Sequence, residues 1–278
     1  MNILDMALLV WLGSLMAGFL GALTGLGGGI IITPLLTLAF GVDIRYAIGA
    51  TLISVIATSS GAAAAYVKEG FSNIRIGMFL EIATTIGAVT GASIAARVPT
   101  SWIAIMFGLV LIYSAYASSR PPLPDSGMDG PDRIATLLRM DSSFPTPSGP
   151  RSYHVRAVPA GFSLMFVAGA VSGLLGIGSG ALKVIAMDRA MRLPFKVSTT
   201  TSNFMIGVTA AASAAVYLRR GYLDPGLAMP VMLGVLLGSF LGARVLTEAK
   251  SRKLRILFGI VVAVMALEMI YHGLTGRL

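Results

Sequence analysis

The fold is decided by residues 25–34, Gly-Leu-Gly-Gly-Gly-Ile-Ile-Ile-Thr-Pro, which begin with four glycines in five positions. A second cluster, Gly-Ile-Gly-Ser-Gly, occupies residues 176–180. Both lie between apolar segments, where an unbroken helix would be more stable because each interior glycine costs about 1 kcal/mol relative to alanine. We therefore expect a broken helix at both places.

The two clusters belong to an internal repeat, because a shift of 151 residues aligns the halves of the chain without a gap and keeps eight glycines in register. We take residues 1–118 as the first repeat and residues 152–278 as the second. Residues 119–151 form a linker rich in proline, with the composition of a mobile, solvated loop. Ile134 and Leu137, with arginines beside them, leave open one or two turns of interfacial helix.

The composition indicates a membrane protein. Of the 278 residues, 55% are apolar and 12% charged, and the mean hydropathy is +0.83, whereas soluble domains have about 25% charged residues. Long apolar runs of helical character recur, and the alternation that a transmembrane β-barrel needs is absent. We expect an all-α polytopic membrane protein, in which each repeat has a glycine-broken helical hairpin followed by three transmembrane helices. The runs of the first repeat are residues 6–23, 30–40, 46–67, 74–96 and 102–117, and those of the second are 159–175, 181–191, 197–218, 227–245 and 254–271.

The positions of the basic residues predict the orientation. If each broken hairpin returns to its starting side, the repeats are inverted, and 15 of the 20 Lys and Arg other than Lys183 lie on the side of the linker. Four simple crossings per repeat would divide them 10 to 10. The positive-inside rule favours the first arrangement. It places the linker in the cytoplasm and both termini outside, in the plasma (inner) membrane of the cell, and inverted repeats are typical of secondary transporters.

Several functional classes are excluded. The net charge of +9 lies in short loops, as expected of topology signals, so we expect no nucleic-acid partner. There is no cysteine, and the apolar runs hold no cluster of Asp, Glu and His, so we expect no metal and no cofactor. A serine protease at Ser179 would need a histidine, but the predicted topology puts His154 and His272 on opposite sides of the membrane. We therefore expect no enzyme.

The glycine clusters predict an anion site. Irregular backbone at membrane depth must line a cavity or be buried in protein, and the N–H groups that open the next helix attract anions. The alternative is close helix packing. Thr33 and Pro34 give a second possible start for the first short helix. The substrate-binding candidates in the clusters are Gly25, Gly27, Gly28, Gly29, Gly176, Gly178, Ser179 and Gly180.

Lys183 is the strongest single candidate for a substrate-binding residue. It follows Gly180 by three positions, at a helix start where both the helix dipole and the bilayer disfavour a cation. A bound anion would offset both the unfavourable helix dipole and the cost of placing a cation within the bilayer. The alternatives are that Lys183 extends to the cytoplasmic interface or pairs with Asp188 or Glu81. Its partner in the repeat alignment is Ile32, so the site is not symmetric in charge.

Polar residues that open the next helix complete the candidate site. The run of residues 198–203 supplies hydroxyl and amide donors, of which Ser202 and Asn203 are the first choices and Thr51 and Thr201 follow. Some of these side chains are expected to bond to their own helix. Glu81, about two turns into its span, is the candidate for coupling to protons. It could instead pair with Lys183 or reach the cytoplasmic interface.

These motifs resemble the TauE/SafE group of sulfite exporters and anion permeases. The resemblance rests on the segments "GLGGGIIITP" and "GIGSGALKV", each about twenty residues before "RYAIGATL" or "KVSTTTSNF", and it covers nearly the whole chain. It implies secondary transport, without ATP, of sulfite, thiosulfate, sulfoacetate and related organosulfonates. It also implies roles for residues 25–29, 176–180 and 201–203. The long linker and Lys183 depart from the family pattern.

Together these observations favour a secondary transporter, and an exporter in particular, of small inorganic or organic sulfur oxyanions. Alternating access would move one repeat against the other, with protons as the hypothesised coupling ion. The expected partners are the anion and the lipid bilayer. A passive anion channel could use the same helix dipoles but would keep a continuous pore. A membrane assembly factor without transport would bind no substrate.

Overall fold

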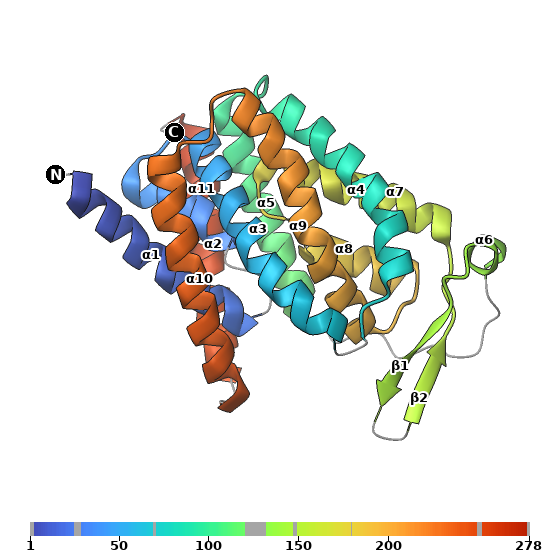
Figure 1. Cartoon of the computed structure of the whole chain (residues 1–278). Helices are drawn as coiled ribbons and strands as arrows, with labels where there is room; N and C mark the ends of the chain where they lie inside the picture. Colours follow the sequence, from blue (N-terminus) through green and yellow to red (C-terminus); the bar gives the residue numbers. More distant parts are fainter. Residues whose placement is uncertain are drawn as a thin grey trace.

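A computed structural model of the chain describes residues 3–24, 29–68, 71–119, 132–146, 149–178, 180–248 and 252–276. These residues form a bundle of helices, from which a short helix and a two-stranded hairpin project (Figure 1). The expectation of an all-α fold is confirmed for the bundle, and the hairpin is the exception. Within the described ranges, five helices are long and apolar enough to cross a membrane, and others are shorter apolar helices.

The two halves of the chain contain the same elements in the same order. In the first half these are α1 (Ile3–Thr24), α2 (Gly29–Pro34), the π-helical turn η1 (Leu35–Ala39), α3 (Ile44–Lys68), α4 (Ile74–Ala95) and α5 (Thr100–Ser119). In the second half they are α7 (Val158–Leu175), α8 (Gly180–Ile185), the π-helical turn η2 (Ala186–Ala190), α9 (Phe195–Arg219), α10 (Pro225–Glu248) and α11 (Arg252–Thr275). Each predicted apolar run coincides with these helices to within a few residues. The short helix, the π turn and the long helix after it begin and end 151 residues apart in the two halves.

The first short helix does not start at Thr33 and Pro34. It begins at Gly29, Pro34 is its last residue, and the π turn follows directly. The hydroxyl of Thr33 bonds to Thr51 of α3 rather than capping the helix. Proline is not the general cause of the π turn, because Ala186–Ala190 forms the same turn after Ile185.

Glycines bring two pairs of helices into backbone contact. A side chain on any of these glycines would overlap the backbone of the neighbouring helix. The contacts advance in the same direction along both helices, so α4 runs parallel to α7, and α1 runs parallel to α10. Between α4 and α7, Gly87 lies against Phe166, Gly91 against Ala170, and Gly173 against Ala88. Between α1 and α10, Gly234 lies against Trp11 and Gly238 against Leu15.

Two further pairs run antiparallel. Gly49 of α3 lies against Tyr222, just beyond the end of α9, whereas Gly207, in the middle of α9, lies against Ser59, ten residues farther along α3. Likewise, contacts of Gly108 with Ala266 and of Gly273 with Ser101 set α5 against α11 in opposite directions. Each antiparallel pair therefore consists of helices at equivalent positions in the two halves.

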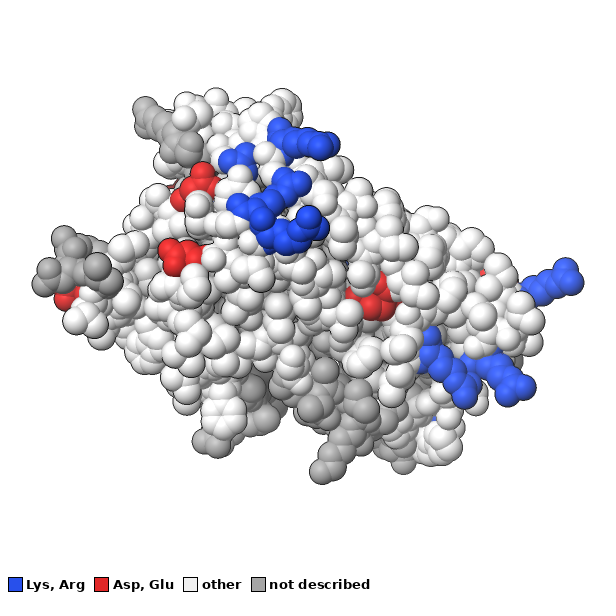
Figure 2. Space-filling model, turned by 45° about the horizontal axis from the view of Figure 1, so that its top comes forward, with Lys and Arg blue, Asp and Glu red and all other residues white. Residues whose placement is uncertain are grey.

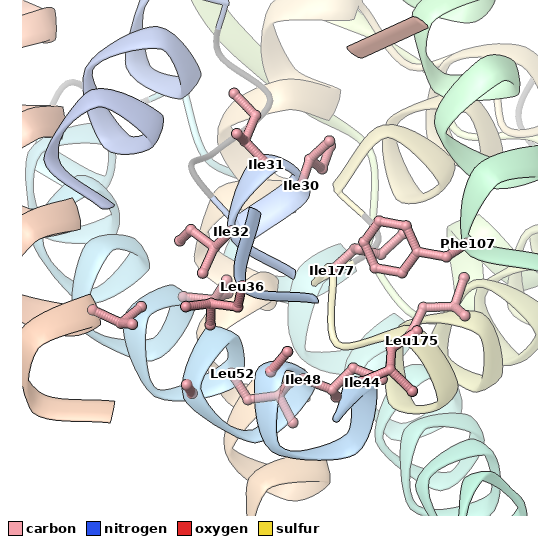
Figure 3. Close-up of a cluster of buried hydrophobic side chains, with 14 of the residues drawn as sticks. Ile30, Ile31, Ile32, Leu36, Ile44, Ile48, Leu52, Phe107, Leu175 and Ile177 are labelled. Carbon is pink, nitrogen blue, oxygen red and sulfur yellow. The ribbon is translucent and has the colours of Figure 1, made fainter. Parts of the chain in front are cut away.

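Apolar side chains fill the centre of the bundle. Figure 3 shows Ile32 and Leu36 of the first short segment in one cluster with Ile48 and Leu52 of α3. Phe107 of α5 joins the same cluster, as do residues at the end of α7. The first short segment is thus held in the core, between the long helices.

The outer faces of several helices are apolar. Ile82 and Ile86 of α4, and Leu233 and Leu237 of α10, are each about half exposed and stand four residues apart on one helix face. Soluble proteins rarely expose apolar patches of this extent. Figure 2 shows Lys and Arg gathered in two groups, with a mainly uncharged surface between them. Both features fit a protein surrounded by lipid.

The linker is more ordered than its composition suggests. Within its described residues it forms α6 (Arg133–Leu137), which contains the apolar residues noted above, and a hairpin of β1 (Ser142–Thr146) and β2 (Gly149–Tyr153). Asp132 caps α6, because its carboxylate accepts from the N–H of Ile134 at 3.2 Å. The expectation of a mobile loop is therefore wrong for this part of the linker.

Asn73, directly before α4, fastens the hairpin to the bundle. Its side-chain amide donates to the carbonyl of Met140 at 3.0 Å and to the hydroxyl of Tyr153 at 2.7 Å, and its oxygen accepts from the N–H of Ile76 at 3.1 Å. Burial raises the pKa of the Tyr153 phenol above its usual range. Asn73, Met140 and Tyr153 are all buried, and the linker packs through an apolar cluster that it shares with α4, α7 and α9.

Candidate functional site

The second glycine cluster, residues 176–180, interrupts the helix between α7 and α8. Gly176 and Gly178 both have a backbone φ of 70°, in the left-handed region that other residues rarely adopt. Gly176 ends α7, and its N–H donates to the carbonyl of Ser172 at 2.7 Å. The break expected from the glycines is present here. Gly25, Gly27, Gly28 and Ser179 lie outside the described residues.

Both short helices begin in the same part of the bundle. Gly29, the first residue of α2, lies against Val55 of α3, and Gly180, the first residue of α8, lies against Ile206 of α9. Val55 and Ile206 are equivalent positions, 151 residues apart. Gly178 touches both of them. The starts of α2 and α8 therefore lie close together, between the antiparallel helices α3 and α9.

On the side of the first repeat, Thr51 joins α2 to α3. Its hydroxyl donates to the carbonyl of Ala47 at 2.8 Å and lies 2.9 Å from the hydroxyl of Thr33. Because a hydroxyl has one proton, Thr33 is the donor in this second bond. The methyl group of Thr51 also lies beside Gly29. Thr51 is therefore next to the start of α2, but its proton is already used.

The three polar residues predicted on α9 point in different directions. The oxygen of Thr201 accepts from the backbone N–H of Asn73 at 3.0 Å, on the side of the linker. The Ser202 hydroxyl donates to the carbonyl of Gly180 at 3.2 Å, at the start of α8. Asn203 is half-buried, and its amide forms no hydrogen bond with the described residues. The structure thus brings Ser202, but not Thr201, to the glycine cluster.

Lys183 lies fully buried in α8 and faces the first repeat. Its Nζ donates to the Thr209 hydroxyl of α9 at 2.5 Å and lies 4.0 Å from Oε2 of Glu81 in α4. The Thr209 hydroxyl in turn donates to Oε1 of Glu81 at 2.7 Å. Of the alternatives considered for Lys183, proximity to Glu81 is the one found in the structure. Thr209 connects the two charges.

The two oxygens of the Glu81 carboxylate are in different surroundings. Oε1 accepts from Thr209 and, at 3.2 Å, from Thr85 on the same helix. Oε2 is buried and has no hydrogen-bond partner, and Lys183 is the cation beside it. Buried charges at membrane depth are costly unless they are paired. Each of the two side chains, Lys183 and Glu81, therefore needs the other to compensate its buried charge.

Thr209 was missed from the sequence. A threonine inside a helix commonly bonds to the carbonyl four residues earlier, and for Thr209 the carbonyl of Met205, at 3.1 Å, is the second acceptor within reach. Its contact with Glu81 depends on helix packing, which the sequence does not show. One indication was available, because Thr209 lies seven residues, about two turns, after Ser202 and hence on the same face of α9.

Comparison with known proteins identifies the family. The sequence matches the family described as "Sulfite exporter TauE/SafE" over residues 10–269. The chain belongs to the TauE/SafE family. It is 28% identical to "Probable membrane transporter protein YunE" of Bacillus subtilis, over 98% of this chain and 99% of that protein. It is 27% identical to a "Probable membrane transporter protein" of Xylella fastidiosa, over 96% of both, and 23% identical to "Probable membrane transporter protein MJ0441" of Methanocaldococcus jannaschii, over 91% of both. No solved structure matches significantly.

Membership of the TauE/SafE family and the apolar helices make the chain a multi-pass membrane transporter rather than an enzyme. Its family implies an anionic substrate. In this TauE/SafE protein the buried cation, the start of α8 and Ser202 lie at α9, and the start of α2 lies against the neighbouring helix α3.

Proposed function

We propose that this TauE/SafE protein is a secondary transporter that exports small sulfur-containing oxyanions, such as sulfite, thiosulfate or organosulfonates, by alternating access. The observation that supports this proposal most directly is that α2 and α8 begin close together. The start of α8 lies against α9, and α9 also contains Thr209, which accepts a hydrogen bond from the buried Lys183. N–H groups at helix starts and a lysine ammonium both favour oxyanions. The family description, which names sulfite, supports the choice of substrate class.

In this proposal the anion lies at the glycine clusters, residues 25–29 and 176–180, within reach of Lys183. Ser202 and Thr51 stand beside the starts of the short helices. Asn203 offers an amide that has no hydrogen bond to the described residues. Thr201 has a supporting role, because its oxygen accepts from Asn73.

The proposed topology has inverted repeats, with the linker in the cytoplasm and both termini outside. The antiparallel pairs α3 with α9 and α5 with α11 support it, because helices equivalent in four-crossing repeats would run parallel. Two arginines assigned to the outside also share one end of the bundle. Arg45 donates to the carbonyl of Val98 at 2.9 Å, and Arg220 donates to that of Ser93 at 3.0 Å.

Movement of one repeat against the other would switch access to the site. The glycine contacts of α1 with α10 and of α4 with α7 both lie between the repeats, where such sliding would occur. Protons are the proposed coupling ion, and Glu81 is the proposed proton carrier.

The test is a thermal-unfolding screen of the purified protein in detergent against sulfite, thiosulfate, sulfoacetate, sulfate, phosphate and chloride. An anion at 100 times its Kd should add about 2.7 kcal/mol to the free energy of unfolding. We expect a sulfur oxyanion to stabilise the protein, and Lys183→Ala and Asn203→Ala to abolish this effect. The exposed Lys196 provides the control, since Lys196→Ala should keep it.

Transport measurements in proteoliposomes then distinguish a carrier from a passive anion channel. A carrier shows saturable flux and counter-flow driven by unlabelled substrate, whereas a channel shows neither. If no anion stabilises the protein and none is transported, the proposal fails, and a role in membrane assembly would replace it.

A further inference from the structure

The chain of Lys183, Thr209 and Glu81 joins the two repeats through a balanced pair of charges. Lys183 is 0% exposed and Glu81 is 8% exposed. Thr209 accepts from the lysine and donates to Oε1 of the glutamate, while Oε2 is left without a hydrogen-bond partner. The pair as a whole is neutral, but the carboxylate is incompletely satisfied.

The helices packed around Glu81 offer no other counter-ion. α7, Val158–Leu175, has no ionisable side chain. The cations of α9, Lys196 and Arg219, lie at its two ends, and Arg75 lies in the first turn of α4. The one ionisable residue of α8 is Lys183. Among the described residues, Lys183 is therefore the single cation close enough to compensate a charge on Glu81.

We propose that Glu81 is a built-in counter-ion which the substrate anion displaces from Lys183, so that the binding of one monovalent anion requires the uptake of one proton. This inference rests on the proposed function. An anion that joined Lys183 while Glu81 stayed ionised would leave one uncompensated negative charge inside the bundle. A proton from water that forms an O–H bond on the Glu81 carboxylate restores neutrality.

Thr209 connects protonation of Glu81 to the release of Lys183. Its hydroxyl proton has two acceptors within reach, Oε1 of Glu81 at 2.7 Å and the carbonyl of Met205 at 3.1 Å. When Glu81 becomes neutral, the hydroxyl can turn to Met205, and its oxygen no longer connects the lysine to the glutamate. Lys183 keeps all its protons and is released toward the anion. Thr209 is thus a positioning residue that couples the two states.

The experiment measures anion affinity against pH for the purified full chain. The probe of the pH dependence is methanesulfonate, a monovalent anion that does not titrate between pH 5 and pH 8. Sulfite is a second probe for binding only, because it takes up a proton itself in this range. For the wild type we expect the Kd to fall about tenfold for each unit decrease in pH while Glu81 is ionised in the free protein. Glu81→Gln should bind tightly at all pH values. Glu268→Gln, which changes an exposed carboxylate of α11, should behave like the wild type.

A second measurement needs no variant. Calorimetric titration at pH 7 in buffers of different ionisation enthalpy counts the protons taken up with each anion, and we expect about one for the wild type. Anion binding that takes up no proton at any pH overturns the coupling and leaves the proposed function intact. The same holds if Glu81→Gln retains the pH dependence of the wild type. If neither probe binds at any pH, both proposals fail.

Discussion

Gly91 of α4 lies against the carbonyl oxygen of Ala170 of α7 so closely that a β-carbon at residue 91 would overlap it. Gly169 of α7 makes the reciprocal contact with the backbone of Thr84. The same kind of contact joins Gly18 of α1 to Val235 of α10. The two repeats therefore touch backbone to backbone on two interfaces.

This contact predicts that Gly91→Ala destabilises the protein although alanine is the better helix former. Separating the two backbones should lower the free energy of unfolding by about 1–3 kcal/mol, as over-packing does in well-packed cores. Gly259 of α11 is the matched control, because no atom of the part of the chain that the structure describes lies within 4 Å of a β-carbon there. Thermal unfolding in detergent checks both, and equal behaviour of the two variants would show that the α4–α7 contact is not tight.

Much of the fold could be predicted because its determinants are local. Runs of apolar residues marked the helices, and the glycines at 176 and 178 marked a real break, since both adopt a positive φ. The hairpin over residues 142–153 was missed, because a run rich in proline is usually a loop. Its order depends on Asn73, which is distant in sequence.

The candidate site could be predicted only in part. Lys183 stood out because a cation at a helix start within an apolar segment is unfavourable wherever the helix packs. Its partners could not be chosen, because Glu81 and Thr209 are 128 residues apart in sequence and meet only when α4 packs against α9. Thr201 and Ser202, adjacent on one helix, face different neighbours for the same reason.

The dependence of Lys183 on Glu81 predicts a strong coupling in stability. Lys183→Met leaves the carboxylate buried without its cation and should lower the free energy of unfolding by about 3 kcal/mol near neutral pH. Adding Glu81→Gln removes the stranded charge, so the double variant should recover most of that loss. Unfolding measurements on the wild type, both single variants and the double variant give the coupling energy.

Lys196 again provides the control for this cycle, because it is exposed at the start of α9. Its ammonium lies 3.5 Å from the centre of the Phe71 ring, so Lys196→Met should lower the free energy of unfolding by about 1 kcal/mol or less, which is well below the effect expected for Lys183→Met. Additive effects of Lys183→Met and Glu81→Gln would mean that the two charges do not interact in the folded protein.

Asn73 predicts the behaviour of the linker. Asn73→Ala removes the amide that bonds to Met140 and Tyr153, so the hairpin should detach more often from the bundle. We expect faster tryptic cleavage after the exposed Arg139 and Arg151, and a loss of about 1–3 kcal/mol in stability. Tyr153→Phe removes one acceptor and should have a smaller effect. Cleavage at the wild-type rate in Asn73→Ala would show that other contacts hold the hairpin.

The inverted topology predicts that the linker and the C-terminal end of α11 lie on opposite sides of the membrane. The chain has no cysteine, so single cysteines can be introduced without a background. Ser152→Cys in β2 and Thr275→Cys at the end of α11 are suitable because both side chains are exposed. A membrane-impermeant maleimide added to intact cells should label Cys at 275 and reach Cys at 152 only after the cells are opened. Four simple crossings per repeat would put both positions on one side, and equal labelling of the two would contradict the inverted arrangement on which alternating access depends.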